Sequence, residues 1–363
     1  DKDYDFINVV SCKPEQIIFI AFPLAVLYKI LGWIPGIKSL IKKNKIINAF
    51  SNSTMVIDEA GISFVDSRGF VMNTYAFICG AVPMLLGTPV CKYSQAMGTF
   101  KNFYNRLLAK IILPKYKLLC ARGQATYDNL KGIGIEKNVK LCADGAFMMA
   151  DDEKWTEEIE KVTSEDAFYQ KEVVGLSISS VVEKKCNKMG IAYKDIMVEF
   201  INYLQSKGYG VLLIANAARI NSTKPRNNDL MIGDAIYNEI ADKDNVRWYH
   251  KEMDAEEIRE YIGKCKCLVA SRFHAMVGSL EKKVPVFLIG WSHKYKEVMD
   301  MFHLGEYAID FSKMDAELIK KGFENFESND AQIRENLEKY HEEVLASSAL
   351  NLKYITEIID GME

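Results

Sequence analysis

Short apolar runs alternate along the chain with longer stretches in which apolar residues recur every three or four positions. The runs are rich in β-branched residues and nearly continuous in apolarity, which is typical of strands that are covered on both faces. The helical spacers between them favour parallel β-α-β units. The sequence therefore predicts an α/β fold with strands over residues 54–57, 89–93, 116–120, 173–178, 210–214, 267–270 and 284–289.

A polar interval from Asp151 to Asp166 divides these strands into two series. The chain has 363 residues, which exceeds the usual size of a single domain. We therefore predict two Rossmann-like, doubly wound domains over 1–160 and 161–335, followed by a helical tail over 336–363. Ligands are expected in a cleft between the domains, at the carboxyl ends of the strands.

The amino-terminal end of the sequence carries two further signals. Apolar and polar residues alternate over Phe6–Val10, which predicts a strand. Because no strand precedes it in the sequence, we predict that the first domain lacks its first β-α unit. Residues 17–34 are the candidate for membrane contact, although Pro23 and Lys29 interrupt the stretch and no signal-peptide cleavage pattern follows. A buried helix is one interpretation of this stretch, and a surface that rests on the bilayer is the other.

Charge and cysteine usage narrow the function classes. The net charge is −3, so no global basic field argues for nucleic acid. Most of the eight cysteines lie in apolar stretches, which indicates buried, reduced thiols and favours the cytoplasm. Cys265 and Cys267 form a close pair, but no second pair has zinc spacing, and no metal is expected.

The most informative stretch directly follows the strand at 267–270. Ser271 is a favourable helix N-cap, and the stripe of a core-packed helix follows at positions 273, 276, 277 and 280. Arg272 and His274 then fall in the first turn, off that stripe. Unsatisfied N–H groups, the positive helix end and a guanidinium at one point suit an anion. The alternative is that Arg272 forms a structural ion pair and that His274 is a satisfied polar residue.

One strand further along, Lys294 lies where a loop enters the next helix. The buried face of that helix is marked by Tyr295, Val298, Met299 and Phe302. If the two strands are neighbours in the sheet, Arg272, His274 and Lys294 converge. A solvated lysine is the alternative, and His293 competes for any role of Lys294.

Several motifs, in order, resemble the polysaccharide pyruvyl transferase family. The clearest is Ser271-Arg-Phe-His-Ala275, followed by an apolar helix, a Val-Pro-Val strand and a basic helix start. The upstream matches are Val56–Asp66 with its Gly/Ser loop, Gln95–Phe100, Ala121–Thr126, Asp144–Phe147 and Gly175–Ser177. The resemblance covers residues 54–305. It is supported by the order of the motifs rather than by any single motif.

The resemblance implies a fold like that of the GT-B glycosyltransferases. It also implies that phosphoenolpyruvate is the donor substrate, with no cofactor, and that a sugar acceptor receives a cyclic pyruvate ketal. Arg272 and Arg122 would hold the carboxylate and the phosphate by bidentate contacts. His274 would be the general acid/base, and Lys294 would stabilise the departing phosphate.

The resemblance also suggests residues that would hold the substrates. Asp58, Glu59 and Gln95, at strand ends of the first domain, are the candidates for the sugar, although the two carboxylates would equally cap a helix or a turn. Ser177 and Ser271 complete the set of candidate substrate-binding residues. The sugar would belong to a cell-surface polysaccharide or to its lipid-linked precursor, handled in the cytoplasm at the inner face of the membrane.

Two other function classes compete with this interpretation. A GT-B glycosyltransferase would use the same helix start for the diphosphate of a nucleotide sugar, with Glu256 or Glu257 as the carboxylate for its ribose. An inactive relative would bind carbohydrate without releasing phosphate. A Rossmann dehydrogenase is disfavoured, because no Gly-x-Gly-x-x-Gly motif follows a strand.

Overall fold

The computed structural model describes residues 8–221, 227–290 and 293–362. The chain forms two compact units, the first comprising Asp1–Gly145 and Ser347–Glu363 and the second Ala146–Ala346. These units differ from the boundaries expected at 160 and 335. The charged interval belongs to helix α8 (Glu153–Glu165), which packs against α12 (Ala255–Gly263) of the second unit, so a boundary at 160 falls inside a helix.

The first unit is built on a parallel four-stranded sheet. Its strands are β1 (Val56–Asp58), β2 (Val90–Gln95), β3 (Leu118–Arg122) and β4 (Val139–Cys142), in the order β1-β2-β3-β4. The crossovers run through α5 (Gly69–Leu86), α6 (Phe103–Ile112) and α7 (Gln124–Gly132). Because successive right-handed crossovers advance in one direction, these helices cover one face of the sheet.

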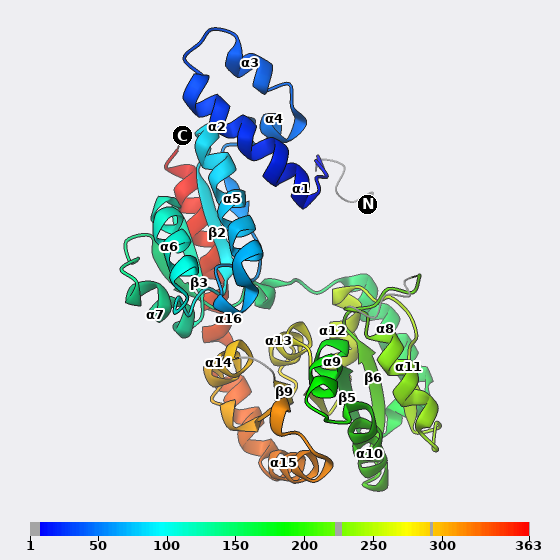
Figure 1. Cartoon of the computed structure of the whole chain (residues 1–363). Helices are drawn as coiled ribbons and strands as arrows, with labels where there is room; N and C mark the ends of the chain where they lie inside the picture. Colours follow the sequence, from blue (N-terminus) through cyan, green and yellow to red (C-terminus); the bar gives the residue numbers. More distant parts are fainter. Residues whose placement is uncertain (1–7, 222–226, 291–292, 363) are drawn as a thin grey trace. The chain divides into compact units, whose positions relative to one another are not determined.

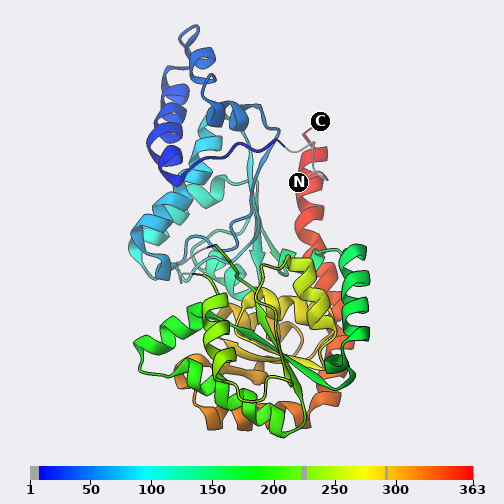
Figure 2. The same cartoon turned by 90° about the vertical axis from the view of Figure 1, so that its right-hand side faces the viewer.

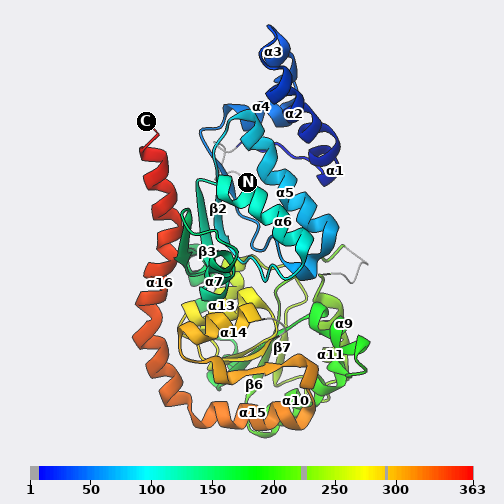
Figure 3. The same cartoon turned by 60° about the vertical axis from the view of Figure 1, so that its left-hand side comes forward.

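The other face of this sheet is covered by the carboxyl end of the chain. Helix α16 (Asp330–Asp360) runs along the sheet on the side opposite α5 (Figure 2, Figure 3). Ile355 packs there against Cys91, Leu118 and Cys142, and Asn351 donates a hydrogen bond of 2.9 Å to the carbonyl of Ala143. The predicted tail over 336–363 is therefore not a separate element, because Ser347–Glu363 belongs to the first unit and the residues before Ser347 belong to the second.

The second unit has a six-stranded, fully parallel sheet in the order β10-β9-β8-β5-β6-β7 (Figure 1). The strands are β5 (Val173–Ile178), β6 (Gly210–Ala215), β7 (Val246–Trp248), β8 (Cys267–Ala270), β9 (Val286–Gly290) and β10 (Ala308–Asp310). The flanking helices include α9 (Ser180–Lys188), α10 (Tyr193–Ser206), α11 (Leu230–Glu239), α13 (Phe273–Glu281), α14 (His293–Met301) and α15 (Ala316–Ser328). The order reverses direction between β5 and β8, which is the doubly wound arrangement.

All seven strands predicted over 54–289 are present, and β5 and β8 have the predicted bounds. Three short strands were not predicted, namely β4, β7 and β10. The predicted strand Phe6–Val10 is wrong for Asn8–Val10, which are exposed and belong to no strand, while Phe6 and Ile7 lie outside the described residues.

A helical segment precedes β1 in the first unit. It comprises α1 (Pro14–Gln16), a π-helical turn (Ile17–Ala21), α2 (Phe22–Leu31), α3 (Ile37–Ile41) and α4 (Lys45–Asn52). One side of the segment packs against Ile78, Val82 and Leu86 in the carboxyl-terminal half of α5. This cluster is separate from the core between the sheet and α5 to α7. The buried-helix interpretation of residues 17–34 is therefore correct for one face only.

Candidate active site

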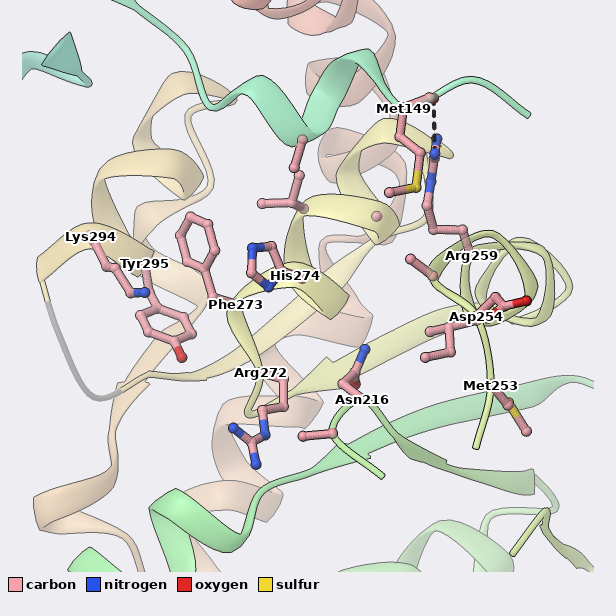
Figure 4. A pocket seen from close by; sticks show the side chains of 16 residues that line it. Met149, Asn216, Met253, Asp254, Arg259, Arg272, Phe273, His274, Lys294 and Tyr295 are labelled. Carbon is pink, nitrogen blue, oxygen red and sulfur yellow. Dashed lines mark hydrogen bonds between the residues drawn. The ribbon is translucent and has the colours of Figure 1, made fainter. Parts of the chain in front are cut away.

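A pocket of about 740 Å³ lies in the second unit, lined by residues that follow the carboxyl ends of β6, β8 and β9. This is the region where the strand order of the second sheet reverses, which is where open α/β sheets bind ligands. Among the polar lining residues are Asn216, Asp254, Arg259, Arg272, His274 and Lys294 (Figure 4). All of the lining residues belong to the second unit.

The junction between β8 and α13 places two of these side chains. Helix α13 begins at Phe273, and its N-cap is Arg272 rather than the expected Ser271. The N–H of Ser271 still bonds the carbonyl of Ser177 at 2.9 Å, so Ser271 continues the sheet and cannot cap the helix. Its side chain is buried. Ser271 therefore does not line the pocket, contrary to its predicted role in substrate binding.

Arg272 is held by a bidentate ion pair with Asp229. Its Nε donates to Asp229 Oδ2 at 2.9 Å, and its Nη2 donates to Asp229 Oδ1 and, at 3.2 Å, to Ser180 Oγ. Asp229 is fully buried and also accepts the N–H groups of Ser180 and Ala217 at 2.9 and 3.0 Å. The structural ion pair considered for Arg272 is thus present. Because Arg272 also lines the pocket, the pair fixes the direction of the guanidinium there.

His274 and Lys294 lie on either side of Phe273 (Figure 4). The ring of His274 packs edge-to-face on Phe273 with centroids 5.5 Å apart, and Lys294 Nζ lies 4.3 Å from the Phe273 centroid. β8 and β9 are neighbours in the sheet, so the expected convergence of Arg272, His274 and Lys294 on one pocket is present. The side chain of His293, the competitor of Lys294, lies outside the described residues.

Ser177 orients the side chain of Asn216, which lines the pocket. The Ser177 hydroxyl is fully buried and donates to Asn216 Oδ1 at 2.6 Å. This bond leaves the amide nitrogen of Asn216 directed into the pocket (Figure 4). Ser177 is therefore a positioning residue and not a lining residue. Asn216 was not predicted, and the available signal was only a polar residue placed directly after the apolar run at 210–214.

The wall of the pocket formed by α12 carries a second guanidinium. Arg259 Nη1 donates to the carbonyl of Met149 at 2.9 Å, and Nη2 pairs with Glu281 of α13. The lining thus contains Arg259, Arg272 and Lys294 against the single carboxylate of Asp254. Because Asp229 and Glu281 pair with the two guanidiniums from outside the lining, these side chains offer an anionic ligand directed N–H donors rather than a net positive charge.

The first unit gathers the other predicted side chains at the carboxyl ends of β1, β2 and β3. Gln95 Nε2 donates to the carbonyl of Asp58 at 2.7 Å, and Arg122 pairs with Asp144 at 2.9 Å. Asp58 Oδ1 accepts the N–H of Ala60 at 3.0 Å, so it caps a turn, while Glu59 is exposed. Asp58, Gln95 and Arg122 therefore share one edge of the sheet.

A buried lysine at this edge was missed. Lys92 has no exposed surface, and its ammonium contacts Asp58 Oδ2 at 2.6 Å and Gln95 Oε1 at 3.0 Å. The rings of Phe64 and Tyr116 lie 5.4 and 5.0 Å from the same nitrogen. The signal in the sequence was a lysine inside an otherwise apolar strand, since buried charges are normally paired.

Comparison with known proteins decides the family. The family model described as polysaccharide pyruvyl transferase matches residues 18–293, about three quarters of the chain. The chain belongs to the polysaccharide pyruvyl transferase family. A curated relative in polysaccharide synthesis is the amylovoran biosynthesis protein AmsJ of Erwinia amylovora, which is 22% identical over 296 residues, covering 78% of this chain and 69% of AmsJ.

Solved structures with the same fold are distant in sequence from this pyruvyl transferase. UDP-GlcNAc 2-epimerase from Neisseria meningitidis, bound to UDP-GlcNAc, aligns with a TM-score of 0.55 at 12% identity and covers 88% of this chain and 82% of its own. Trehalose-6-phosphate synthase OtsA gives 0.56 at 8% identity, with 97% and 84% covered. Anabaena HepE, in complex with UDP-glucose, gives 0.52 at 10%, with 98% and 97% covered. The likeness confirms the two-domain, GT-B-like fold.

Among the described residues of the pyruvyl transferase, no cluster of three or more His, Cys, Asp or Glu side chains is arranged to hold a metal ion. The cysteines at all eight positions are free thiols. The predicted cleft between the domains stays a prediction, as do the chemical roles of the pocket residues.

The buried Lys92 of the pyruvyl transferase makes its stability depend on pH. Burial lowers the pKa of Lys92 below its ordinary value, so between that lowered pKa and about 10.5 the unfolded chain binds the additional proton. Unfolding in this window takes up a proton, and raising the pH therefore stabilises the fold. We expect the unfolding free energy of the wild type, relative to Lys92→Met, to rise by up to about 1.4 kcal/mol per pH unit.

Urea unfolding of both proteins between pH 7 and 10 measures this difference. Cysteines and tyrosines titrate in the same range, but they do so in both proteins and drop out of the comparison. A difference that stays constant or falls with pH contradicts the prediction.

Proposed function

We propose that the protein transfers a pyruvyl group from phosphoenolpyruvate to two hydroxyls of one sugar, forming a cyclic ketal and releasing phosphate. The sugar belongs to a cell-surface polysaccharide or to its lipid-linked precursor. The family membership and the AmsJ relative support pyruvyl transfer in polysaccharide synthesis. The observation that carries the donor assignment is the convergence of Arg272, His274 and Lys294 on one pocket.

The donor fits the charges of this pocket. Phosphoenolpyruvate carries close to three negative charges on a small body, and directed cations hold such an anion better than diffuse positive charge. Arg272 is already oriented by Asp229, so it would bind the anion without first losing side-chain freedom. Asn216 offers a neutral donor on the same side. Arg122 stays a proposal as a substrate-binding residue, since it belongs to the first unit and is paired with Asp144.

The proposed reaction is an addition to the double bond of phosphoenolpyruvate followed by substitution of the phosphate. The proton of the first sugar hydroxyl replaces the one that His274 donates, and the proton of the second leaves with the phosphate. His274 protonates the methylene carbon of phosphoenolpyruvate, and a sugar hydroxyl adds to the central carbon and gives up its proton. The bond from that carbon to the phosphate oxygen then breaks, with Lys294 stabilising the charge on the departing phosphate. A second hydroxyl of the sugar closes the ketal and loses its proton. One phosphoenolpyruvate and one diol yield one ketal and one phosphate.

We propose that the sugar acceptor binds to the first unit. Asp58, Gln95 and Glu59 present carboxylate and amide groups at the carboxyl edge of its sheet, and such groups bind sugar hydroxyls. The free cysteines support a reducing compartment, so we place the reaction in the cytoplasm, at the inner face of the membrane.

The two glutamates considered for the ribose of a nucleotide-sugar donor do not lie in the pocket. Glu257 is buried and paired with Lys251, and neither Glu256 nor Glu257 lines the pocket. The structural relatives bound to UDP-GlcNAc and UDP-glucose share the fold at 12% and 10% identity, which shows the fold alone.

Ligand-induced stabilisation separates the two donors. Phosphoenolpyruvate at about one hundred times its Kd is expected to raise the unfolding free energy by about 2.7 kcal/mol, and UDP-glucose is expected to have no effect. Lys294→Gln should lose most of this stabilisation. Lys296→Gln, on the exposed side of the same helix and paired with Asp300, should keep it. Stabilisation by UDP-glucose with none by phosphoenolpyruvate would overturn the proposal.

A further inference from the structure

The helical segment before β1 has an unusual charge pattern. From Gln16 to Ile57 the chain has no Asp or Glu, although the chain as a whole has a net charge of −3. The same stretch contains the five lysines Lys29, Lys38, Lys42, Lys43 and Lys45. All five lie within α2 to α4 or their connections. The segment is therefore a local cationic region on a weakly acidic protein.

Helix α2 and the π-helical turn before it are apolar on two opposite faces. The inner face, with Ile17, Ala21 and Ala25, is buried against α5. The outer face carries side chains at helical spacing that are exposed, namely Phe19 (73%), Leu27 (43%) and Ile30 (60%). An outer face exposed to water would normally be polar.

Exposed apolar side chains also follow the end of α2 along the chain. Trp33, in the turn that follows, is 81% exposed, and Leu40 of α3 is 61% exposed. Among the described residues, Trp33 is thus one of the most exposed large apolar side chains, and it lies between Lys29 and Lys38 in the sequence. We call Phe19, Leu27, Ile30, Trp33 and Leu40 the outer apolar face. In Figure 1 and Figure 3, α2 and α3 lie at the outer end of the first unit, beyond α5.

We propose that the outer apolar face and its lysines dock this protein onto a bilayer that contains anionic lipid. Contiguous exposed apolar side chains mark interaction sites. Charge selects the occupant here, because a lysine-rich region without carboxylates complements an anionic headgroup layer. Tryptophan is favoured at the boundary between headgroups and hydrocarbon, where its ring is half in each.

The geometry favours a helix that lies on the membrane over one that crosses it. Pro14–Leu31 and Asp66–Leu86 are both long and apolar enough to span a bilayer, with 17% and 33% of their residues buried. Crossing would require α2 to leave Ile78 and Val82 of α5, and α5 to leave the sheet whose crossover it forms. Docking through the outer apolar face requires neither change.

Vesicle sedimentation of the full chain tests the proposal. The protein is expected to sediment with vesicles of 70% phosphatidylcholine and 30% phosphatidylglycerol, and to remain in solution with phosphatidylcholine alone. Replacing Lys38, Lys42, Lys43 and Lys45 by Gln should weaken binding by about fivefold per lysine. The triple variant Ile30→Ser, Trp33→Ser and Leu40→Ser should abolish binding.

A matched control uses exposed apolar side chains elsewhere in the first unit. Phe103 and Leu107 of α6 are 70% and 43% exposed, and their replacement by Ser should leave vesicle binding unchanged. All variants should keep the wild-type melting temperature and its increase with phosphoenolpyruvate, because none of the altered residues lines the pocket. The docking proposal therefore fails or holds independently of the proposed donor.

Three outcomes overturn the proposal. The first is absence of binding to anionic vesicles, or binding that the triple variant retains. The second is a wild-type dimer in sedimentation equilibrium that the triple variant dissociates, which would show that a second copy covers the outer apolar face. The third is association that survives 1 M NaCl and alkaline carbonate, which would indicate an embedded helix rather than a docked one.

Discussion

Replacement of His274 by alanine is expected to slow turnover by about 10²–10⁴-fold, the usual contribution of a single general acid/base. Its imidazole lies in the first turn of α13 beside Phe273, lines the pocket and is exposed, so its loss removes little buried surface. Stabilisation by phosphoenolpyruvate should persist, because Arg272 and Lys294 remain. Phosphate release in the presence of an acceptor measures the turnover, and thermal unfolding measures the stability.

His250 provides the matched control for this substitution. It is a second exposed histidine of the same unit, paired with Asp234 outside the pocket lining. His250→Ala should keep its turnover within about twofold of the wild type, since a surface ion pair contributes at most about 1 kcal/mol to stability and none to the chemistry. Equal turnover of the His274 variant and the wild type would exclude the proposed role.

Replacement of Asp229 by alanine is expected to have the largest effect on stability, a loss of about 3–5 kcal/mol. Asp229 is fully buried and accepts four hydrogen bonds, two from Arg272 and one each from the N–H groups of Ser180 and Ala217. Its removal leaves the partly buried guanidinium without its counter-charge, and it takes the acceptor from the N–H groups of Ser180 and Ala217. Urea unfolding at pH 7 measures the loss.

The same substitution separates stability from positioning. Because Arg272 would no longer be oriented, binding of phosphoenolpyruvate should weaken at least tenfold even at temperatures where the variant is folded. Asp300→Ala, which removes an exposed carboxylate paired with Lys296 in the same unit, should change the unfolding free energy by less than about 1 kcal/mol and leave binding intact. A loss of unfolding free energy below about 1 kcal/mol for Asp229→Ala would contradict the role assigned to the Arg272–Asp229 ion pair.

The sequence predicts the second unit best where burial is continuous. β5 and β8 have the predicted bounds because both are covered on both faces and carry no charged residue. The stripe at 273, 276, 277 and 280 is buried as expected, and it correctly places His274 off the core. β7 and β10 could not be recognised as apolar runs, because each has three residues and β7 carries Arg247 in its centre.

The residues that orient the site are harder to predict than the residues that line it. Asp229 lies at the start of α11, 43 positions before Arg272 in the sequence, and the two residues meet only in the folded chain. Ser177 was expected to touch substrate, yet its hydroxyl is buried and directs Asn216. Ser271 reads as a cap by residue type, but its place in the β-ladder decides otherwise. Residue type and spacing thus predict which polar side chains lie at the strand ends. The hydrogen-bond partners of these side chains depend on tertiary structure.

The dependence of the first sheet on α16 has a consequence for how the protein is made. β1 to β4 are translated before the second unit, whereas Ser347–Glu363, which covers their second face, is translated after it. The whole second unit, Ala146–Ala346, is translated in between, which takes roughly 10–40 s at ordinary elongation rates. During that interval the face over Cys91, Leu118 and Cys142 is open to water. The first unit therefore completes its fold only after Ser347–Glu363 has been translated, and until then its nascent strands are expected to be prone to aggregation.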